Sequence, residues 1–254
     1  MSKNMKYTKK AKLLEKSHKK EEVNPVLREG PNIRKIFSDE VLSRITPSVI
    51  LLDLCCGPGN FLKSLSRRIP HGFLAGIDIS PEMLERARDT TPFPNVAIIK
   101  GDIARLPFSS SIFDMVTCQL GPVTMSETYR VLKHEGWFIY TSVGPRSNKE
   151  LQTIFRERYT FKYYKSEDEY TWKDIILKNA HEAGFDKIDI SDFLNYAYYT
   201  PEGLTGYLKA VPVVREFDSK KDQPYIQEIA YKYGTPKGIR ITHQYFILRA
   251  RKIV

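Results

Sequence analysis

Short apolar segments along this chain alternate with segments in which apolar residues recur every three or four positions. The apolar segments are "VILLDL", "FLAGIDI", "VAIIK", "FDMVTCQL" and "WFIYTSV". Between them, "NFLKSLSRRI", "ETYRVLK" and the stretch that begins at Ser80 and Pro81 have the period of amphipathic helices. Because strands without a polar face are covered by helices on both sides, the pattern predicts an α/β fold with a doubly wound, parallel sheet.

The two ends of the chain add further elements. Residues 31–46 have the pattern of an amphipathic helix with Pro31 at its first position. In the last third we expect a helix in "TWKDIILKNAHEAGF", a strand in "KIDISDFLNYAYY" and a closing strand in "HQYFILRARK". Between these two strands, approximately residues 200–239 form a predicted helical insert. A length of 254 residues favours a single domain over 1–254.

The formal net charge of +10 is concentrated near the N-terminus. Residues 1–20 hold eight lysines and one glutamate, a net +7, which leaves 32 basic and 29 acidic residues, or +3, for residues 21–254. The body of the protein is therefore close to neutral. Only the basic N-terminal arm, residues 1–20, suggests a phosphate or membrane-surface partner, and a solvated, frayed terminus is its default interpretation.

Other features of the composition narrow the class of protein. No apolar run approaches the roughly 20 residues that cross a bilayer, and the first lysines are not followed by a signal-peptide pattern, so we expect a cytoplasmic protein. Cys55, Cys56 and Cys118 lie in apolar segments without metal-ligand spacing. This predicts reduced, buried thiols and no metal site.

A glycine-rich loop, "CCGPGN", follows the first strand, which ends at Leu54, and leads into a helix near Asn60. In a parallel α/β sheet the ligand crevice lies at the carboxyl ends of the strands, where the strand order reverses. Gly57 and Gly59 allow a tight turn and a close approach of a ligand to the backbone. A dinucleotide fingerprint would need a third glycine where Leu62 stands, which disfavours a dinucleotide.

Two aspartates follow the next two strands. Asp78 ends "GID" 19 positions after Gly59, where a carboxylate can accept hydrogen bonds from both hydroxyls of a ribose. In "GDIARLPF", Asp102 can accept a hydrogen bond from an adenine amino group, and the Ile103 amide can meet a ring nitrogen. Three successive strand ends thus offer contacts for an amino acid moiety, a ribose and an adenine.

The segments "VILLDLCCGPGNFL", "GIDISPEMLERAR", "KGDIARLPFSSSIFDMV" and "YRVLKHEGWFIY" resemble, in this order, the motifs of class I S-adenosylmethionine-dependent methyltransferases. The likeness is to the group of ubiquinone- and menaquinone-biosynthesis enzymes and related small-molecule methyltransferases. It spans roughly residues 49–142, with a looser match to the end. It implies a Rossmann-like, seven-stranded sheet whose last strand is antiparallel, in agreement with the seven predicted strands. It also implies S-adenosylmethionine as the cofactor.

The resemblance implies a set of residues for the methionine end of the cofactor. Asp53 and the backbone of Cys55 and Gly57 would hold it, and Gly59 and Asn60 would complete the loop. The first glycine of the usual loop is Cys55 here, so the backbone at this position must suit a residue with a side chain. We expect a small adjustment of the loop rather than loss of binding.

For the adenosine, the resemblance implies that Asp78 takes the ribose hydroxyls and that Ile79 and Met83 pack near the adenine, with Asp102 and Ile103 at its edge.

The resemblance also places Gln119, after the fourth strand, beside the transferable methyl group. The stretch that follows it, "LGPVTMSETYRVL", is shorter than the family segment that often carries a histidine and acidic residues near the acceptor. No catalytic residue is therefore assigned. His243 and His181 are candidate bases, although a lone histidine is more often packed or solvated.

Tyrosines before and within the predicted insert suit an aromatic or partly apolar small-molecule acceptor, or simply pack in the core. They are Tyr163, Tyr164, Tyr170, Tyr196, Tyr198, Tyr199 and Tyr207.

Three functions stay open at this point. The favoured one is methyl transfer to a small molecule at carbon, oxygen or nitrogen. The second is an RNA methyltransferase that holds phosphate with the 1–20 arm, against which stand the near-neutral body and the strand end "CQLGPV", unlike the motif of many base-amino methyltransferases. The third is a cofactor-binding protein without transferase activity. The oligomeric state is not predicted.

Overall fold

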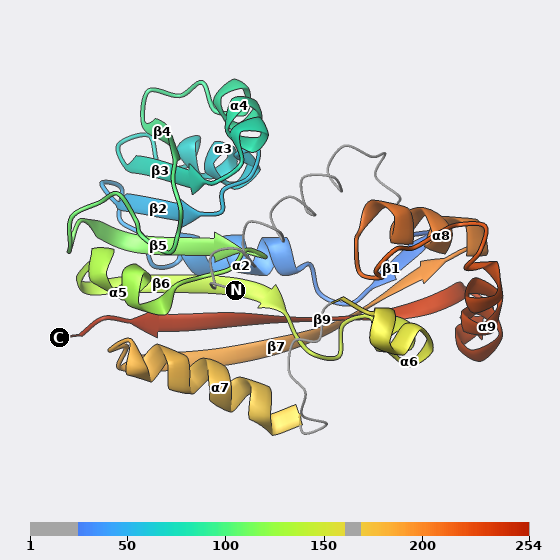
Figure 1. The fold of residues 1–254 in the computed structure, drawn as a ribbon. Coiled ribbons are helices and arrows are strands. Elements are labelled where there is room, and N and C mark those ends of the chain that lie inside the picture. The colour runs from blue at the N-terminus through green and yellow to red at the C-terminus, as the bar shows by residue number, and fades with distance from the viewer. Residues whose placement is uncertain (1–24, 161–168, 254) are drawn as a thin grey trace.

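In the computed structural model, which describes residues 25–160 and 169–253, a single mixed sheet runs through the whole molecule (Figure 1). Its strands lie in the order β1-β7-β9-β6-β5-β2-β3-β4, and β8 pairs with β9. The strands are β1 (Leu27–Glu29), β2 (Ile50–Leu54), β3 (Phe73–Asp78), β4 (Val96–Lys100), β5 (Phe113–Gln119), β6 (Leu132–Val143), β7 (Lys187–Tyr199), β8 (Gly234–Thr235) and β9 (Gly238–Arg251).

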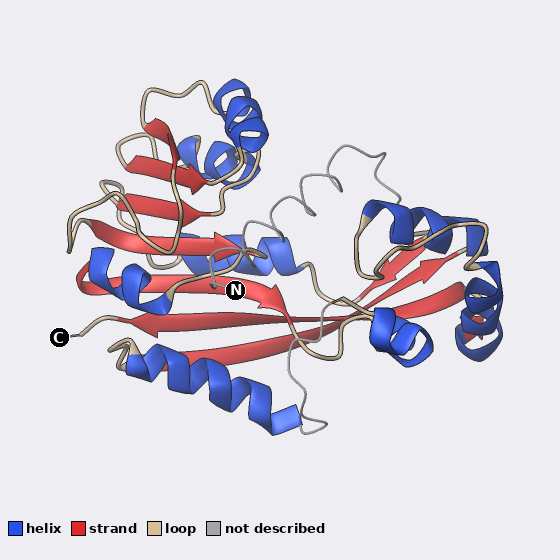
Figure 2. Cartoon of the chain, in the orientation of Figure 1, coloured by secondary structure: helices blue, strands red, loops and turns tan. Residues whose placement is uncertain are grey.

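Helices cover both faces of this sheet (Figure 2). They are α2 (Ile33–Leu42), α3 (Asn60–Ser66), α4 (Pro81–Thr90), α5 (Met125–Val131), α6 (Lys149–Phe155), α7 (Glu169–Glu182), α8 (Pro201–Ala210) and α9 (Gln223–Tyr233), with a 3-10 turn at Arg156–Arg158. Side chains of α2 and α3 share one apolar cluster with alternate residues of the sheet, and side chains of α5 and α7 share the cluster on the opposite face. The predicted doubly wound sheet is confirmed.

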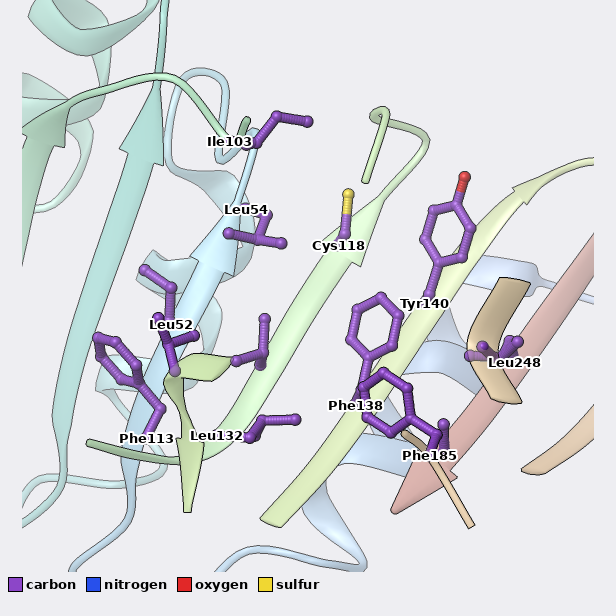
Figure 3. Close-up of a cluster of buried hydrophobic side chains, with 14 of the residues drawn as sticks. Leu52, Leu54, Ile103, Phe113, Cys118, Leu132, Phe138, Tyr140, Phe185 and Leu248 are labelled. Carbon is purple, nitrogen blue, oxygen red and sulfur yellow. The ribbon is translucent and has the colours of Figure 1, made fainter. Parts of the chain in front are cut away.

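The second of these clusters shows how the strands bury their apolar side chains (Figure 3). Leu52 and Leu54 of β2 lie in it with Phe138 of β6 and Leu248 of β9, all at most 1% exposed. At a typical gain of about 25 cal/mol per Å² of apolar surface, such burial is the main stabilising contribution to the sheet.

The strand order reverses at β2. From β2 the chain proceeds through β3 to β4 on one side, then crosses to β5, which pairs with β2 on the other side. These four strands are parallel, whereas β9 is antiparallel to both β6 and β7, as expected for the last strand. The loop after β2 therefore lies at the topological switch point, where open α/β sheets bind ligands.

Local signals place some helix ends correctly and miss others. The Ser80 side chain caps α4 by accepting a hydrogen bond from the Met83 amide, as predicted. The predicted first helix is shorter than 31–46, because Asn32 supplies the cap and Pro31 lies outside it. The "ETYRVLK" helix ends at Val131, because the chain from Leu132 already pairs with β5.

Strands β7 and β9 reach far beyond the strands that precede them. The last β6–β9 pair is Val143 and Tyr245, so residues Gly238–Gln244 of β9 extend past β6 by about 23 Å. Helices α6, α8 and α9 cover this projection with a separate apolar cluster that includes Leu208 and Ile229. Both predicted helices of the insert are present, whereas α6, β1 and β8 were not predicted.

Where β6 ends, a buried carboxylate takes its place beside β9. Glu150 of α6 is 1% exposed and accepts hydrogen bonds from the Thr242 amide at 3.0 Å and the Thr242 hydroxyl at 2.6 Å. The Asn148 amide in turn donates to the Thr242 carbonyl. Between the ends of β6 and β8, the backbone of β9 at Thr242 is therefore satisfied by Glu150 and Asn148.

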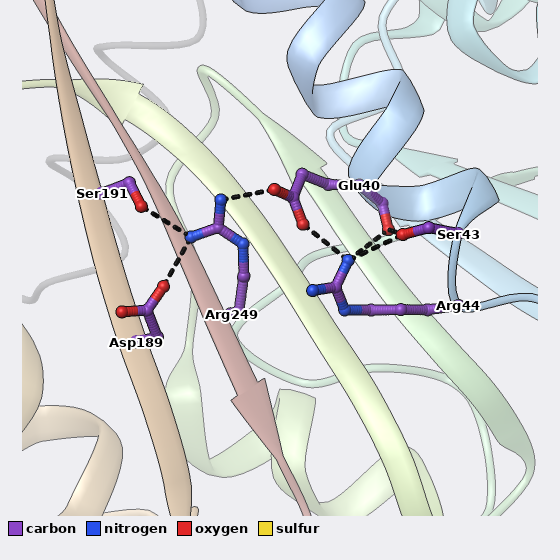
Figure 4. Close-up of polar contacts among 6 residues, drawn as sticks. All are labelled: Glu40, Ser43, Arg44, Asp189, Ser191 and Arg249. Carbon is purple, nitrogen blue, oxygen red and sulfur yellow. Dashed lines mark hydrogen bonds and ion pairs between the residues drawn. The ribbon is translucent and has the colours of Figure 1, made fainter.

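A network of charged side chains fastens α2 to the sheet (Figure 4). Arg249 of β9 bridges Glu40 of α2 at 2.6 Å and Asp189 of β7 at 2.7 Å, and Glu40 also binds Arg44. The hydrogen bond from Arg249, followed by the positive charges of Arg249 and Arg44, outweighs burial and lowers the pKa of Glu40.

None of the helices in the described part of the chain is long and apolar enough to span a membrane.

Candidate active site

Left-handed backbone conformations shape the loop between β2 and α3. Gly57 has φ +54° and Gly59, which precedes α3, has φ +77°. Cys55 adopts φ +53°, so the residue that replaces the usual first glycine keeps a glycine-like conformation. Such a conformation costs a residue with a Cβ about 1–2 kcal/mol. The turn is therefore kept at the expense of strain.

The surface of this loop leaves room for a ligand. A Cβ built at Gly57 would meet nothing within 4 Å, whereas one at Gly59 would come within 3.0 Å of Thr91 on the helix side. The Gly57 and Gly59 amides are already engaged, by the Asp78 carboxylate at 2.9 Å and the Cys56 carbonyl at 3.1 Å. The Gly57 carbonyl accepts only a weak contact from the Cys56 thiol at 3.8 Å, and carbonyls suit a cationic ammonium group.

Asp78 ties the ends of β2 and β3 together. One carboxylate oxygen accepts from the Gly57 amide and the other from the Ser80 amide, both at 2.9 Å. A carboxylate has about four acceptor positions, so capacity for two ribose hydroxyls is left. The carboxylate is half-buried at the switch point, where the sequence predicted a ribose contact.

Asp53 is the buried carboxyl group behind the loop. It is 3% exposed and accepts a hydrogen bond from the Thr117 hydroxyl at 2.8 Å. Burial raises its pKa to about 7; the Thr117 hydrogen bond opposes this shift and the negative charge of Asp78 adds to it. A carboxyl group whose pKa lies near 7 loses its proton readily when a cation binds next to it.

The other predicted residues lie around the same strand ends. Asp102 accepts from the Ala104 amide at 2.9 Å and is half-buried, as is Ile79. Met83 and Ile103 are 4% and 7% exposed and present apolar surface. Asn60, by contrast, is exposed at the start of α3.

Gln119 lies at the end of β5, and Leu120 beyond it was not singled out from the sequence. Leu120 has φ +58° and a side chain that is 48% exposed. A strained backbone and an exposed leucine together are unusual outside functional sites. No feature of the local sequence predicts this conformation.

The fit of these residues to an adenosyl sulfonium can be compared with known proteins. A family described as "Methyltransferase domain" matches residues 51–136. The demethylmenaquinone methyltransferase of Staphylococcus aureus (strain JH9) is 30% identical over 172 residues, which cover 56% of this chain and 70% of that protein.

The chain belongs to the class I S-adenosylmethionine-dependent methyltransferases.

Solved structures agree with this methyltransferase in fold. A protein of Bacillus halodurans C-125 described as a methyltransferase has a TM-score of 0.61 at 18% identity, covering 87% of this chain and all of that one. Phosphoethanolamine N-methyltransferase 2 of Haemonchus contortus, solved with S-adenosyl-L-methionine, has a TM-score of 0.52 at 18% identity, covering 85% of this chain and 52% of that one. The cofactor of this methyltransferase is S-adenosylmethionine.

The two candidate bases of this methyltransferase lie in different surroundings. His181 is exposed near the end of α7. The strand that follows, β7, begins opposite Arg251, which pairs with Trp137 at the end of the strands away from the glycine loop. That end also carries a shallow hollow of about 480 Å³ lined by Trp137 and Arg249. His243 lies on the projecting part of β9, beyond the strand ends that carry the cofactor residues.

The tyrosines predicted for the acceptor side do not form one group. Tyr196 and Tyr198 lie on one face of β7, where Arg240 stacks on Tyr196 and Glu29 binds Tyr198. Tyr199 lies on the opposite face and packs against Tyr207 of α8 with ring centroids 5.4 Å apart. Tyr163 and Tyr164 are outside the described residues. Because successive side chains of a strand point to opposite faces, tyrosines that are neighbours in the sequence, such as Tyr198 and Tyr199, lie on different faces of the sheet.

Proposed function

We propose that this methyltransferase holds S-adenosylmethionine at the loop between β2 and α3 and passes its methyl group to a small-molecule acceptor. The observation that carries this proposal is the meeting of Asp78, the Gly57 turn and the buried Asp53 at the switch point of the sheet. Its relatives include demethylmenaquinone methyltransferases, which supports an acceptor of similar chemical type.

Each residue has a distinct part in this proposal. Asp78 accepts hydrogen bonds from the ribose hydroxyls. Asp102, Ile79, Met83 and Ile103 enclose the adenine.

At the methionine end, the carbonyls of Cys55 and Gly57 meet the ammonium group, and Asp53 behind them becomes ionised as that positive charge arrives. Gly59 and Asn60 begin the helix that closes the loop.

The chemistry of the step needs alignment above all. Bound S-adenosylmethionine supplies an electrophilic methyl group, which an acceptor atom must meet in line. The protein contributes by fixing the cofactor and by excluding other approaches at the end of β5, where Gln119 and Leu120 lie. The helices α8 and α9 of the insert, approximately residues 200–239, are the proposed boundary on the acceptor side.

Transfer of isotope tests the proposal directly. Full-length protein would be incubated with S-adenosylmethionine labelled in the methyl group and a cell extract, then separated into small-molecule, RNA and protein fractions. Label in the small-molecule fraction is expected. Label confined to RNA would favour the alternative that uses residues 1–20, which lie outside the described residues, and binding without label in any fraction would favour a non-catalytic protein.

A further inference from the structure

A pair of unsatisfied polar atoms lies on the projecting part of the sheet. His243 of β9 and Asn195 of β7 are directly opposite each other across the antiparallel pair. Their side chains therefore emerge from the same face, with Cβ atoms about 5 Å apart. The Nε2 atom of His243 and the Oδ1 atom of Asn195 are both buried without a hydrogen-bond partner among the described residues. Buried polar atoms without hydrogen-bond partners on directly opposite residues require an explanation.

The orientation of Asn195 is fixed by its other contact. Its Nδ2 atom donates to the Pro31 carbonyl at 2.6 Å, and a carbonyl can only accept. The amide therefore cannot be flipped without losing this bond, and Oδ1 is an acceptor that awaits a donor. Removing this oxygen from water without a donor disfavours the ligand-free state.

His243 is neutral and enclosed by aromatic rings. It is 9% exposed, its ring stacks near Tyr245 with centroids 6.4 Å apart, and Tyr207 of α8 meets it edge-on at 6.2 Å. Burial, followed by the positive charge of Arg28, lowers the pKa of His243 to about 4. At neutral pH it therefore carries one proton, and two aromatic rings lie beside it.

The position of the pair relates it to the proposed methyl-transfer site. Gln119 pairs with Thr141, which pairs with Ile247 of β9. His243 lies four residues farther along β9, or about 13 Å beyond that row, in the direction in which β2 and β5 end. A group bound there belongs to a part of the acceptor away from the reacting atom.

The two rings beside His243, Tyr207 of α8 and Tyr245 of β9, are both half-buried. The Tyr207 hydroxyl donates to Asn148 Oδ1 at 3.3 Å. The ten residues of α8 include two interior glycines, Gly203 and Gly206, which weaken a helix. Displacement of Tyr207 with α8 would open the covered nitrogen of His243 to a ligand.

On the basis of the proposed function, we infer that His243 and Asn195 form a subsite that binds a hydroxyl group on an aromatic ring of the acceptor. In the tautomer that carries its proton on Nε2, His243 can donate to a hydroxyl oxygen while that hydroxyl donates to Asn195 Oδ1, so one hydroxyl satisfies both atoms at once. A carboxylate would instead oppose the Asn195 oxygen with another acceptor. The rings of Tyr207 and Tyr245 complete a site for a flat, hydroxylated molecule.

The test measures a preference for the hydroxyl group. Full-length protein loaded with S-adenosylhomocysteine would be titrated with 2-naphthol and with 2-methoxynaphthalene, which cannot donate a hydrogen bond. We expect 2-naphthol to bind about tenfold more tightly to the wild type, and this preference to fall below about threefold in His243→Phe. His181→Gln, at the exposed histidine, is the matched control and should retain the full preference.

Three results separate the possible failures. Absence of S-adenosylhomocysteine binding in calorimetry would overturn the proposed function itself. Normal cofactor binding without a hydroxyl preference in the wild type, as for a pair satisfied only by water, would overturn the subsite alone. A preference that survives in His243→Phe would do the same. The thermal midpoint of His243→Phe should equal or exceed that of the wild type, because the substitution removes an unpartnered nitrogen, so misfolding is recognised independently.

Discussion

The two halves of the sheet differ in where they keep strained backbone and buried polar groups. The cofactor half, which we define as β2–β6 with the loops at their carboxyl ends, keeps Cys55 and Leu120 in left-handed conformations and buries the Asp53 carboxyl. The projecting half, in which α6, α8 and α9 cover the ends of β7 and β9, is apolar and closes its strand edge with Glu150. His243 and Asn195 carry buried, unpartnered atoms there, and Asn148, Arg156 and Glu216 are left-handed. Some of these departures lie where ligands are proposed to bind, whereas others, such as the unpartnered Trp172 Nε1 and the left-handed Ser111 and Glu135, lie elsewhere.

The largest expected effect concerns the cofactor half. Asp78→Ala should weaken S-adenosylmethionine binding about a thousandfold, or about 4 kcal/mol, because two hydrogen bonds to a charged carboxylate are lost. Isothermal titration calorimetry would measure the affinity. Asp89→Ala, at an exposed aspartate on α4, is the matched control and should change nothing. An affinity for Asp78→Ala within threefold of the wild type would contradict the assignment of the ribose site.

The second prediction asks whether Asp53 trades stability for binding. Its pKa is raised from 3.8 to about 7 in the folded protein, so the folded state holds an extra proton between these pH values and the free energy of unfolding falls as pH rises. Asp53→Asn should thus be more stable at pH 8 by up to about 4 kcal/mol, with the gain disappearing near pH 4.

Urea unfolding across this pH range would measure the gain. The same variant should bind S-adenosylmethionine more weakly, because a neutral amide cannot ionise next to the ammonium group. A variant less stable than the wild type at pH 8 would show that the carboxylate is compensated in the folded protein.

The third prediction concerns the projecting half. Ile229 of α9 is fully buried in the cluster that α6, α8 and α9 share. Ile229→Ala should lower the free energy of unfolding by about 3 kcal/mol and Ile229→Val by about 1 kcal/mol. Neither should alter the affinity for S-adenosylmethionine, since the residue is remote from the β2–α3 loop. A loss of affinity comparable to that of Asp78→Ala would show that the halves are not functionally distinct.

The smallest effect lies where α2 meets β7 and β9. Glu40→Gln should reduce stability at neutral pH by about 1 kcal/mol, because Arg249 loses a charged partner. The pKa of Glu40 is lowered by Arg249, so this contribution is present above the ordinary pKa and disappears as the pH falls through the lowered one. Thermal unfolding at pH 7 and pH 3 would check this. Asp39→Asn, in an exposed ion pair, should have little effect at either pH.

Sequence reasoning succeeded where the signal was local. The glycine turn, the carboxylate of Asp78 after an apolar strand and the cap at Ser80 each depend on a few consecutive residues. The early start of β9 also had a local signal, since "GIRIT" alternates apolar and polar residues. The burial of Asp53 and the facing of Asn195 with His243 depend on segments far apart in the chain. They became visible only with the strand register.

The length of the pairing between β7 and β9 has a further consequence. Thirteen consecutive residues of β7, Lys187–Tyr199, are paired with β9, and this ladder runs without a break from alongside β6 of the cofactor half into the projecting half. Hydrogen–deuterium exchange at its midpoint, near Phe193 and Tyr245, therefore requires both halves to open at once, so the slowest exchange should occur there rather than in either apolar cluster. Because the two halves are joined by this continuous β7–β9 pairing, they should unfold in a single transition.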